Sequence, residues 1–147
     1  MLRATSLDEL PEILNILKGD MSVIGPRPQL VRDMVFMTDE QRMRHTARPG
    51  LSGLAQVMGR NAITWDRKLE LDLEYIKKVS FFHDVKLVWM TIKNVLVRKN
   101  ITESSEETDV TLDYGDELLK NGKVSQEQYD TLQNQAETYL EGLYINK

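Results

Sequence analysis

The sequence contains no cysteine, little histidine and no long apolar run, and each absence excludes a class of protein. With no cysteine in 147 residues, the chain can form neither a disulfide nor a thiolate metal site. Two histidines, His45 and His83, are too few for a histidine-rich metal site. No apolar run reaches the roughly 18–20 residues that cross a bilayer, and the first ten residues do not resemble a signal peptide. We therefore expect a soluble chain, or one that binds only to a membrane surface.

The net charge of −4 hides an uneven distribution. Residues 1–101 carry 16 Lys and Arg against 12 Asp and Glu, whereas residues 102–147 carry 3 against 11. A basic body with an acidic tail predicts two parts with different partners. We expect the basic body to bind anions. Nucleic acid is a poor candidate, because the whole chain is acidic and few aromatic residues lie among the arginines.

Apolar spacing and turn residues predict a mainly α fold with irregular Pro/Gly loops and at most a small β element. Helices are expected over residues 6–18, 29–37, 38–45, 64–78 and 82–99, followed by a helical hairpin in the tail. A short strand is expected around Leu54–Met58. These elements predict a domain over 1–99, an acidic linker over 100–112 and a hairpin tail over 113–147.

The first helix carries one apolar stripe, which predicts that it is well buried. The stripe consists of Leu7, Leu10, Leu14 and Leu17. Gly19 is a suitable C-terminal stop. Two residues are candidates for the N-cap of this helix. Ser6 has capping-box spacing to Glu9. If Asp8 is the N-cap instead, Pro11 lies in the first turn, where its missing N–H costs no hydrogen bond.

Residues 24–60 contain arginine and no lysine. The six arginines are Arg27, Arg32, Arg42, Arg44, Arg48 and Arg60. Arginine binds phosphate through a planar fork, and the prolines of "GPRP" and "ARPG" fix the backbone beside Arg27 and Arg48. "GRN" places Arg60 in a glycine turn. The pattern favours a phosphorylated ligand, although arginines that pair with the acids of the body remain an equal alternative.

Asp8 and Glu9 stand side by side at the expected start of the first helix. Acidic residues are common there because the helix dipole stabilises them. Adjacent ionised carboxylates can also hold Mg²⁺, and an ionised aspartate can act as a nucleophile on phosphorus. The residues alone leave both interpretations open.

The expected helix over 82–99 has a wide apolar face with basic residues elsewhere. One interpretation is a core helix. The other is a helix that lies at an anionic membrane surface, aided by Trp89 and basic residues such as Lys86 and Lys93.

Three motifs, "LRATSLDELPEILNILKGDMSVIGPRP", "RMRHTARPGLSGLAQVMGRN" and the following "AITWDRKLELDLEYIKK", resemble the bacterial sugar transferases. These are monotopic polyprenyl-phosphate phosphoglycosyl transferases, and the likeness covers about residues 2–98. The resemblance implies Mg²⁺-dependent transfer of a sugar 1-phosphate from a UDP-sugar to polyprenyl phosphate, such as undecaprenyl phosphate. Such a reaction begins the assembly of exopolysaccharide, capsule or another glycan.

The resemblance also implies roles for single residues. Asp8 would attack the sugar-bearing phosphorus and carry a covalent phosphosugar, and Glu9 would bind metal with Asp8 or assist the second step. The implied phosphate- and substrate-binding residues are Arg3, Arg27, Arg48, Arg60 and Asn61. Met58 and Ala47 depart from the family's usual Asn and Val, which predicts altered substrate contacts and intact chemistry.

Family members begin with a membrane-inserted helix and a basic segment, neither of which precedes the catalytic motif here. The resemblance therefore implies an enzyme that acts at the cytoplasmic face of the bacterial inner membrane. This chain would be an N-terminally shortened, soluble form of that enzyme, and it can be inactive. The tail weakly resembles terminal helical hairpins that join copies of a chain, so a homo-oligomer is one expectation. The alternatives are a solvated helical pair folded back on the body, or an acidic hairpin that covers the basic arginine surface. The competing hypothesis is a non-catalytic fragment that binds nucleotide-sugar or serves as an interaction module.

Overall fold

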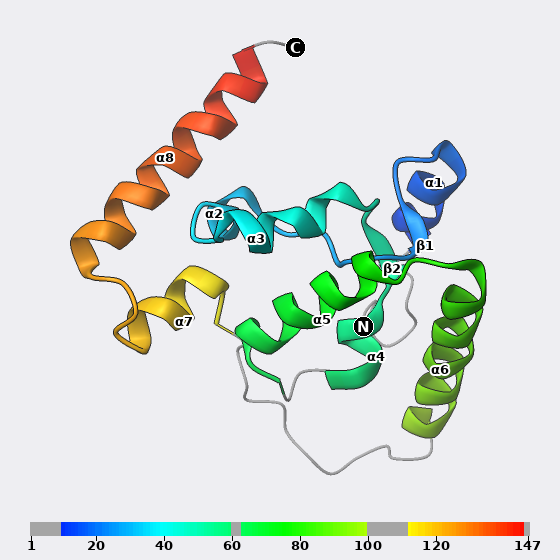
Figure 1. Ribbon diagram of the computed structural model, residues 1–147. Helices are drawn as coiled ribbons and strands as arrows, with labels where there is room; N and C mark the ends of the chain where they lie inside the picture. The colour runs from blue at the N-terminus through cyan, green and yellow to red at the C-terminus, as the bar shows by residue number, and fades with distance from the viewer. Residues whose placement is uncertain (1–9, 60–62, 100–111, 146–147) are drawn as a thin grey trace. The chain divides into compact units, whose positions relative to one another are not determined.

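The computed structural model describes residues 10–59, 63–99 and 112–145, and these residues are mainly helical with one small sheet (Figure 1). This confirms the predicted fold class. The helices are α1 Leu10–Lys18, α2 Val31–Met34, α3 Asp39–Arg42, the 3-10 helix η3 Met43–Thr46, α4 Leu54–Gly59, α5 Trp65–Lys77, α6 Phe81–Lys99, α7 Tyr114–Lys120 and α8 Gln126–Ile145. The strands β1, Ser22–Ile24, and β2, Gly50–Ser52, pair in parallel.

The described residues pack into two compact units. One unit contains those of 1–28 and 43–104, and the other contains those of 29–42 and 105–147. The segment that carries α2 and α3 therefore packs with the tail and not with its neighbours in sequence. The predicted domain boundaries at 99 and 113 stay a prediction, because packing alone does not define a functional domain.

The core of the first unit lies where β1 meets α4, α5 and α6. Its buried members are Ile24, Leu54, Val57, Leu71, Tyr75 and Leu87. Burying a side chain such as Leu87 contributes about 1.5–3 kcal/mol to stability. The Tyr75 hydroxyl donates to Asp84 at 2.9 Å and lies 3.2 Å from the carbonyl of Ile24, so the end of α5 is joined to both β1 and α6.

Helix α1 ends as the sequence predicts. Gly19 has a φ of +85°, its N–H donates to the carbonyl of Ile16, and the N–H of Asp20 donates to that of Asn15. This pair of hydrogen bonds is the Schellman motif, in which glycine adopts the left-handed conformation without steric cost. The start of the helix, at Ser6 or Asp8, lies outside the described residues.

The prediction that α1 is well buried is wrong for its described part. Leu14 is 59% exposed and Leu17 is 79% exposed, and Ile13 beside them is also exposed. An apolar stripe predicts that a helix has an apolar partner, but it does not specify that the partner belongs to the same chain. The face of α1 is thus available to a surface outside the described residues.

The strand expected around Leu54–Met58 is also wrong, because these residues form α4. Leu54 and Val57 are three residues apart, lie on one face of the helix and are both buried. Such short apolar runs fit a strand and a helix equally well in sequence. The strand instead precedes the helix, at Gly50–Ser52.

The predicted C-terminal hairpin is present as α7 and α8 (Figure 1). Gly122 follows α7 with a φ of +68°, as a helix stop requires. Ser125 and Gln128 form the predicted capping box, since each side chain accepts a hydrogen bond from the main-chain N–H of the other. Both helices pack on α2.

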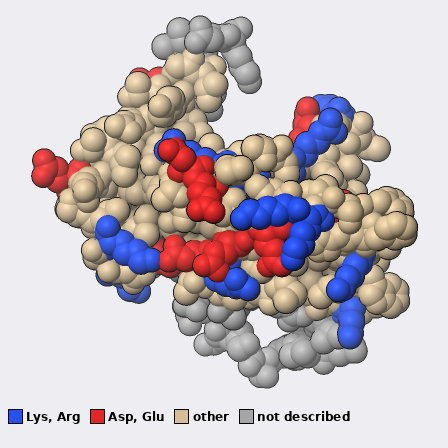
Figure 2. Space-filling view, viewed as in Figure 1, with Lys and Arg blue, Asp and Glu red and all other residues tan. Residues whose placement is uncertain are grey.

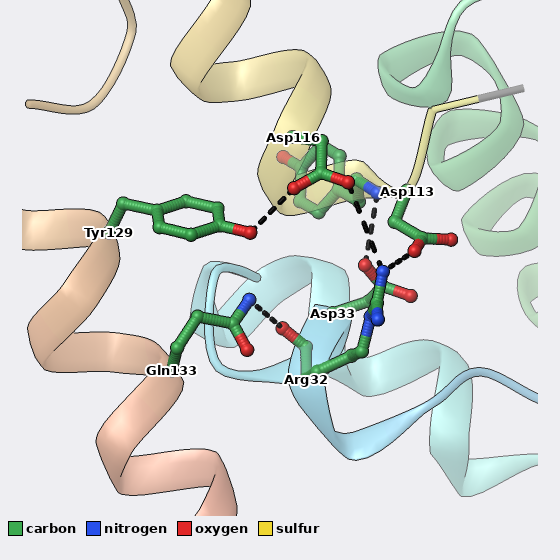
Figure 3. A network of polar contacts seen from close by, with 7 residues as sticks. Arg32, Asp33, Asp113, Asp116, Tyr129 and Gln133 are labelled. Carbon is green, nitrogen blue, oxygen red and sulfur yellow. Dashed lines mark hydrogen bonds and ion pairs between the residues drawn. The ribbon is translucent and has the colours of Figure 1, made fainter. Parts of the chain in front are cut away.

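A buried carboxylate on α2 caps α7 (Figure 3). Asp33 is 2% exposed and accepts a hydrogen bond from the N–H of Tyr114 at 3.0 Å. Asp113, the residue at the N-cap position, makes no side-chain cap bond. Burial raises the pKa of Asp33, and the N–H groups of Gly115 and Tyr114 oppose that shift. Helix α7 is therefore capped by a residue about 80 positions away in sequence.

Arg32 lies beside this cap and contacts the acidic tail (Figure 3). It forms an ion pair with Asp113, and a second carboxylate, that of Asp116, lies 3.9 Å from its guanidinium. Asp116 also accepts a hydrogen bond of 2.5 Å from the hydroxyl of Tyr129 on α8. The Tyr129 ring lies 5.4 Å from that of Phe36. Charged and aromatic contacts thus join both hairpin helices to residues 29–42.

Candidate functional site

The small sheet brings the two proline-glycine turns together. The N–H of Gly50 donates to the carbonyl of Pro26 at 3.0 Å, which joins the "GPRP" turn to the "RPG" turn. Gly25 lies so close to the second turn that a Cβ on it would be 2.3 Å from the carbonyl oxygen of Arg48. No side chain fits in that space. The backbones that carry Arg27 and Arg48 are therefore held side by side.

The arginines of residues 24–60 separate into two groups by their partners. Arg32 pairs with the tail, the guanidinium of Arg42 lies 3.9 Å from Asp39, and Arg44 pairs with Asp72. The alternative interpretation, pairing with the acids of the body, thus holds for Arg42 and Arg44, whereas Arg32 pairs with acids of the tail. Arg27 and Arg48 are exposed, and neither side chain forms an ion pair or hydrogen bond with any residue that the structure describes. Among residues 10–59, 63–99 and 112–145, the two arginines in the stiff turns thus have no counter-charge.

Arg44 and Asp72 form a buried ion pair behind these turns. Their side chains are 1% and 5% exposed. One oxygen of Asp72 accepts hydrogen bonds from Nε at 2.9 Å and Nη2 at 2.5 Å of Arg44. The same Nη2 donates to the carbonyl of Arg27 at 2.8 Å. Burial raises the pKa of Asp72, and the guanidinium opposes the shift.

The sequence analysis did not single out Asp72, although α5 carries a signal for it. Leu69, Asp72 and Tyr75 follow one another at three-residue spacing on a helix, and all three are buried. A charge on the apolar face of a helix needs a buried partner of opposite sign. The sequence offers no means of choosing Arg44 over the other arginines as that partner.

A cleft of about 360 Å³ opens beside Arg48. Its polar lining comes from Ser22, Thr46, Arg48, Tyr75 and Asp84, and its apolar lining from Ile24, Ala47, Ile76 and Val79. Burial first, and then the hydrogen bond to Asp84, raise the pKa of Tyr75 far above its ordinary value. The hydroxyl of Tyr75 donates to Asp84 beside the cleft.

The remaining predicted site residues lie outside the described residues. They are Arg3, Asp8, Glu9, Arg60 and Asn61. In sequence, Asp8 and Glu9 directly precede the first described residue of α1, and Arg60 and Asn61 directly follow α4. Within residues 10–59, 63–99 and 112–145, no group of three His, Asp or Glu residues is placed to hold a metal ion. The assignment of Asp8 and Glu9 as metal ligands stays a prediction.

Helix α6 presents two different faces. Leu87 is buried in the core, whereas Phe82 is 84% exposed and Trp89 is 69% exposed. The exposed apolar face is made by Phe81, Phe82, Val85, Trp89, Ile92 and Leu96. In Figure 2 the surface over α6 is largely uncharged, with basic side chains among it. None of the described helices is long and apolar enough to cross a membrane. The core interpretation thus holds for the face that carries Leu87, and the membrane-surface interpretation of the exposed face stays a prediction.

Comparison with known proteins agrees with the motifs that flank this site. The sequence profile of the family described as "Bacterial sugar transferase" matches residues 1–98, which is two thirds of the chain. The hairpin lies beyond this match.

Three curated relatives have similar sequences. The uncharacterized sugar transferase EpsL of Bacillus subtilis is 45% identical over 108 residues, which cover 74% of this chain and 54% of EpsL. The UDP-glucose:undecaprenyl-phosphate glucose-1-phosphate transferase of Caulobacter vibrioides is 40% identical over 68% of this chain and 40% of that protein. The undecaprenyl-phosphate galactose phosphotransferase of Salmonella typhimurium is 41% identical over 66% of this chain and 20% of that protein.

The chain thus spans about half the length of EpsL and less of the other two. The family match covers α1, both strands, both proline-glycine turns and the helices α4 to α6. On this evidence the chain belongs to the bacterial sugar transferase family.

Proposed function

We propose that the chain is the catalytic part of an enzyme that transfers a sugar 1-phosphate from a UDP-sugar to polyprenyl phosphate. The observation that carries the proposal is the pair of exposed arginines, Arg27 and Arg48, held side by side without a carboxylate partner among the described residues. A UDP-sugar and a polyprenyl phosphate both bring phosphate groups, which guanidinium groups bind in two-point contacts. Transfer to undecaprenyl phosphate also appears in the names of two relatives.

In the first step, a carboxylate oxygen of Asp8 attacks the phosphorus that bears the sugar. An oxygen–phosphorus bond forms to Asp8, the bond to the bridging oxygen of the diphosphate breaks, and UMP leaves with that oxygen. Negative charge builds up on the phosphoryl oxygens, and arginines stabilise it if they are already in place. Arg3, Arg27, Arg48, Arg60 and Asn61 are the residues that we assign to phosphate and substrate binding, with Arg27 at the donor.

In the second step, a phosphate oxygen of the polyprenyl phosphate attacks the same phosphorus. The bond to Asp8 breaks, its carboxylate is regenerated, and the product is a polyprenyl diphospho-sugar. Glu9 assists this step or holds metal with Asp8. The carboxylate oxygens of Asp8 and Glu9 are the ligands that Mg²⁺ prefers, and a bound cation would neutralise charge on the diphosphate. Two steps with a covalent intermediate predict ping-pong kinetics.

The exposed face of α6 supports a membrane surface as the place of reaction. Phe82 and Trp89 offer apolar and aromatic area, and Lys86 and Lys93 are exposed on the same helix. A helix of this type lies in the plane of an anionic bilayer surface. We therefore assign the enzyme to the cytoplasmic face of the bacterial inner membrane, where it would begin exopolysaccharide or capsule assembly.

The test is release of UMP from UDP-glucose and UDP-galactose with Mg²⁺ and a short polyprenyl phosphate in detergent. Two forms are compared: this chain, and a form extended at its N-terminus by the membrane segment that the family resemblance implies. Release by either form supports the proposal, and Asp8→Asn should abolish it while the protein stays folded. Binding of UDP-sugar without release in either form would instead favour the second hypothesis, a non-catalytic module that binds nucleotide-sugar.

A further inference from the structure

The buried pair of Arg44 and Asp72 is joined to the backbone of the turn that carries Arg27. Asp72 holds the guanidinium of Arg44 through Nε and Nη2. Nη2 also donates to the carbonyl of Arg27 at 2.8 Å. A single buried side chain thus links helix α5 to the "GPRP" turn.

This link holds the peptide plane between Arg27 and Pro28 at one orientation within the range that the prolines leave to Arg27. Pro26 and Pro28 have their φ angles fixed by their rings, and a residue before proline is restricted to extended conformations. The carbonyl of Arg27 belongs to the peptide bond that it forms with Pro28. A hydrogen bond to that oxygen therefore sets the rotation of the backbone at Arg27, and with it the direction in which its side chain leaves the turn.

Only arginine can make these contacts together. Its donors point in fixed directions within one plane, whereas the single nitrogen of lysine is a point charge on a flexible stem. Nη1 of Arg44 is buried and has no hydrogen-bond partner among the described residues. An unsatisfied buried donor lowers stability. A well-packed apolar pair would often stabilise such a site equally well, so stability alone is a weak reason for this arrangement.

We propose that Arg44, held by Asp72, is a positioning residue that aims the side chain of Arg27 at the diphosphate of the sugar donor. The inference rests on the proposed function, since Arg27 is assigned to the donor there. Arg44 itself is buried, so we assign it no contact with substrate. Its effect on the reaction passes through the orientation of Arg27.

A double-mutant cycle of Arg44→Lys and Arg27→Ala tests this in the N-terminally extended protein. Arg44→Lys should lower kcat/KM for the UDP-sugar by about 10- to 100-fold, the cost of a misplaced group. With Arg27 already replaced by alanine, Arg44→Lys should have almost no further effect. Equal losses in both backgrounds, or no loss once the folded fraction is measured, would overturn the inference. Arg67→Lys is the matched control, because Arg67 lies exposed on α5 and pairs with Glu70.

A second variant separates positioning from stability. Arg44→Met combined with Asp72→Leu removes both charges and leaves no buried ion unpaired. We expect this protein to fold with a Tm close to that of the unaltered protein, yet to show the same loss in kcat/KM as Arg44→Lys. A folded double variant with unchanged turnover would refute the positioning role.

A binding measurement distinguishes failure of this inference from failure of the proposed function. Calorimetry with pyrophosphate and with UDP-glucose is carried out on the 147-residue chain and on its N-terminally extended form. If no UMP is released but Arg44→Lys weakens binding only when Arg27 is present, the positioning role is supported and the proposed transfer activity is wrong. If the unaltered chain binds both ligands and the Arg44→Lys variant binds them equally well, the positioning role is wrong and the proposed function is unaffected. If neither the unaltered chain nor its N-terminally extended form binds either ligand, both proposals are wrong.

Discussion

Arg44 directs Nε and Nη2 at the same oxygen of Asp72, at 2.9 and 2.5 Å, in a site from which solvent is almost excluded. Ion pairs on the surface contribute little to stability, because water and salt screen the attraction and because ordering two long side chains costs entropy. A buried pair differs, because either partner left alone is a buried charge without compensation. The first unit should therefore respond strongly to changes at this pair.

Asp72→Ala leaves the guanidinium of Arg44 buried without its carboxylate. We expect the free energy of unfolding to fall by about 3–5 kcal/mol, measured by urea denaturation. Glu74→Ala is the control, because Glu74 pairs with Lys78 on the exposed side of the same helix and should cost about 0–1 kcal/mol. Equal costs for the two variants would show that the buried pair is not important for stability.

Gly25→Ala places a methyl group where the backbone of Arg48 already lies. The two turns must move apart, and we expect a loss of about 1–3 kcal/mol in the free energy of unfolding, as in other overpacked sites. Gly142→Ala is the matched substitution, since nothing lies within 4 Å of the added Cβ on α8. That variant should be more stable by about 0.5–1 kcal/mol. A neutral Gly25→Ala would contradict the close contact of the turns.

The docking of the hairpin should depend on pH through Asp33. Because burial raises the pKa of Asp33 in the folded state, the folded protein binds this proton more tightly than the unfolded chain does. The proton on Asp33 therefore stabilises the folded state fully below pH 3.8, the ordinary pKa of the group. This stabilisation is lost as the pH rises through the raised pKa of Asp33. Asp33→Asn keeps an acceptor for the N–H of Tyr114 but removes the titration.

The measurement is Tm between pH 3.5 and 7 for the unaltered protein and for Asp33→Asn. Relative to the unaltered protein, Asp33→Asn should gain stability as the pH rises through the raised pKa of Asp33 and then stay level. Hydrogen exchange at the amide of Tyr114 reports the same change locally. Parallel pH profiles for the unaltered protein and Asp33→Asn would contradict a titrating cap at α7.

Trp89 should report contact between α6 and a bilayer. In a Trp65→Phe background, vesicles that contain phosphatidylglycerol should shift the fluorescence of Trp89 to shorter wavelength, and vesicles of phosphatidylcholine alone should shift it less. Phe82→Ser should weaken the shift, because it removes exposed apolar area. If neither kind of vesicle shifted the emission of Trp89, this face of α6 would be excluded as a membrane contact.

Local structure followed from the sequence where a single residue type fixes the backbone. Gly19 and Gly122 ended their helices because few other residues adopt a positive φ, and Ser125 with Gln128 began α8 because the capping box satisfies exposed N–H groups. A strand was predicted where α4 lies, because an apolar run as short as the one with Leu54 and Val57 fits a strand as well as a helix.

Long-range partners did not follow from the sequence. The six arginines of residues 24–60 look alike in a one-dimensional pattern, yet Arg44 is buried against Asp72, Arg32 contacts the tail, and Arg27 is exposed. Which of them pairs depends on the distance between elements that are far apart in the chain. The sequence did single out the two turns, because proline and glycine beside Arg27 and Arg48 mark a rigid backbone.

The central claim is that the phosphosugar is carried by Asp8, and mass spectrometry tests it most directly. The N-terminally extended protein is mixed with Mg²⁺ and UDP-glucose or UDP-galactose in the absence of acceptor, quenched with acid and digested. We expect the added mass of a hexose phosphate on the peptide that contains Asp8, and none in Asp8→Asn. A stable adduct on another side chain, or an Asp8→Asn protein that transfers sugar phosphate at the normal rate, would contradict the account.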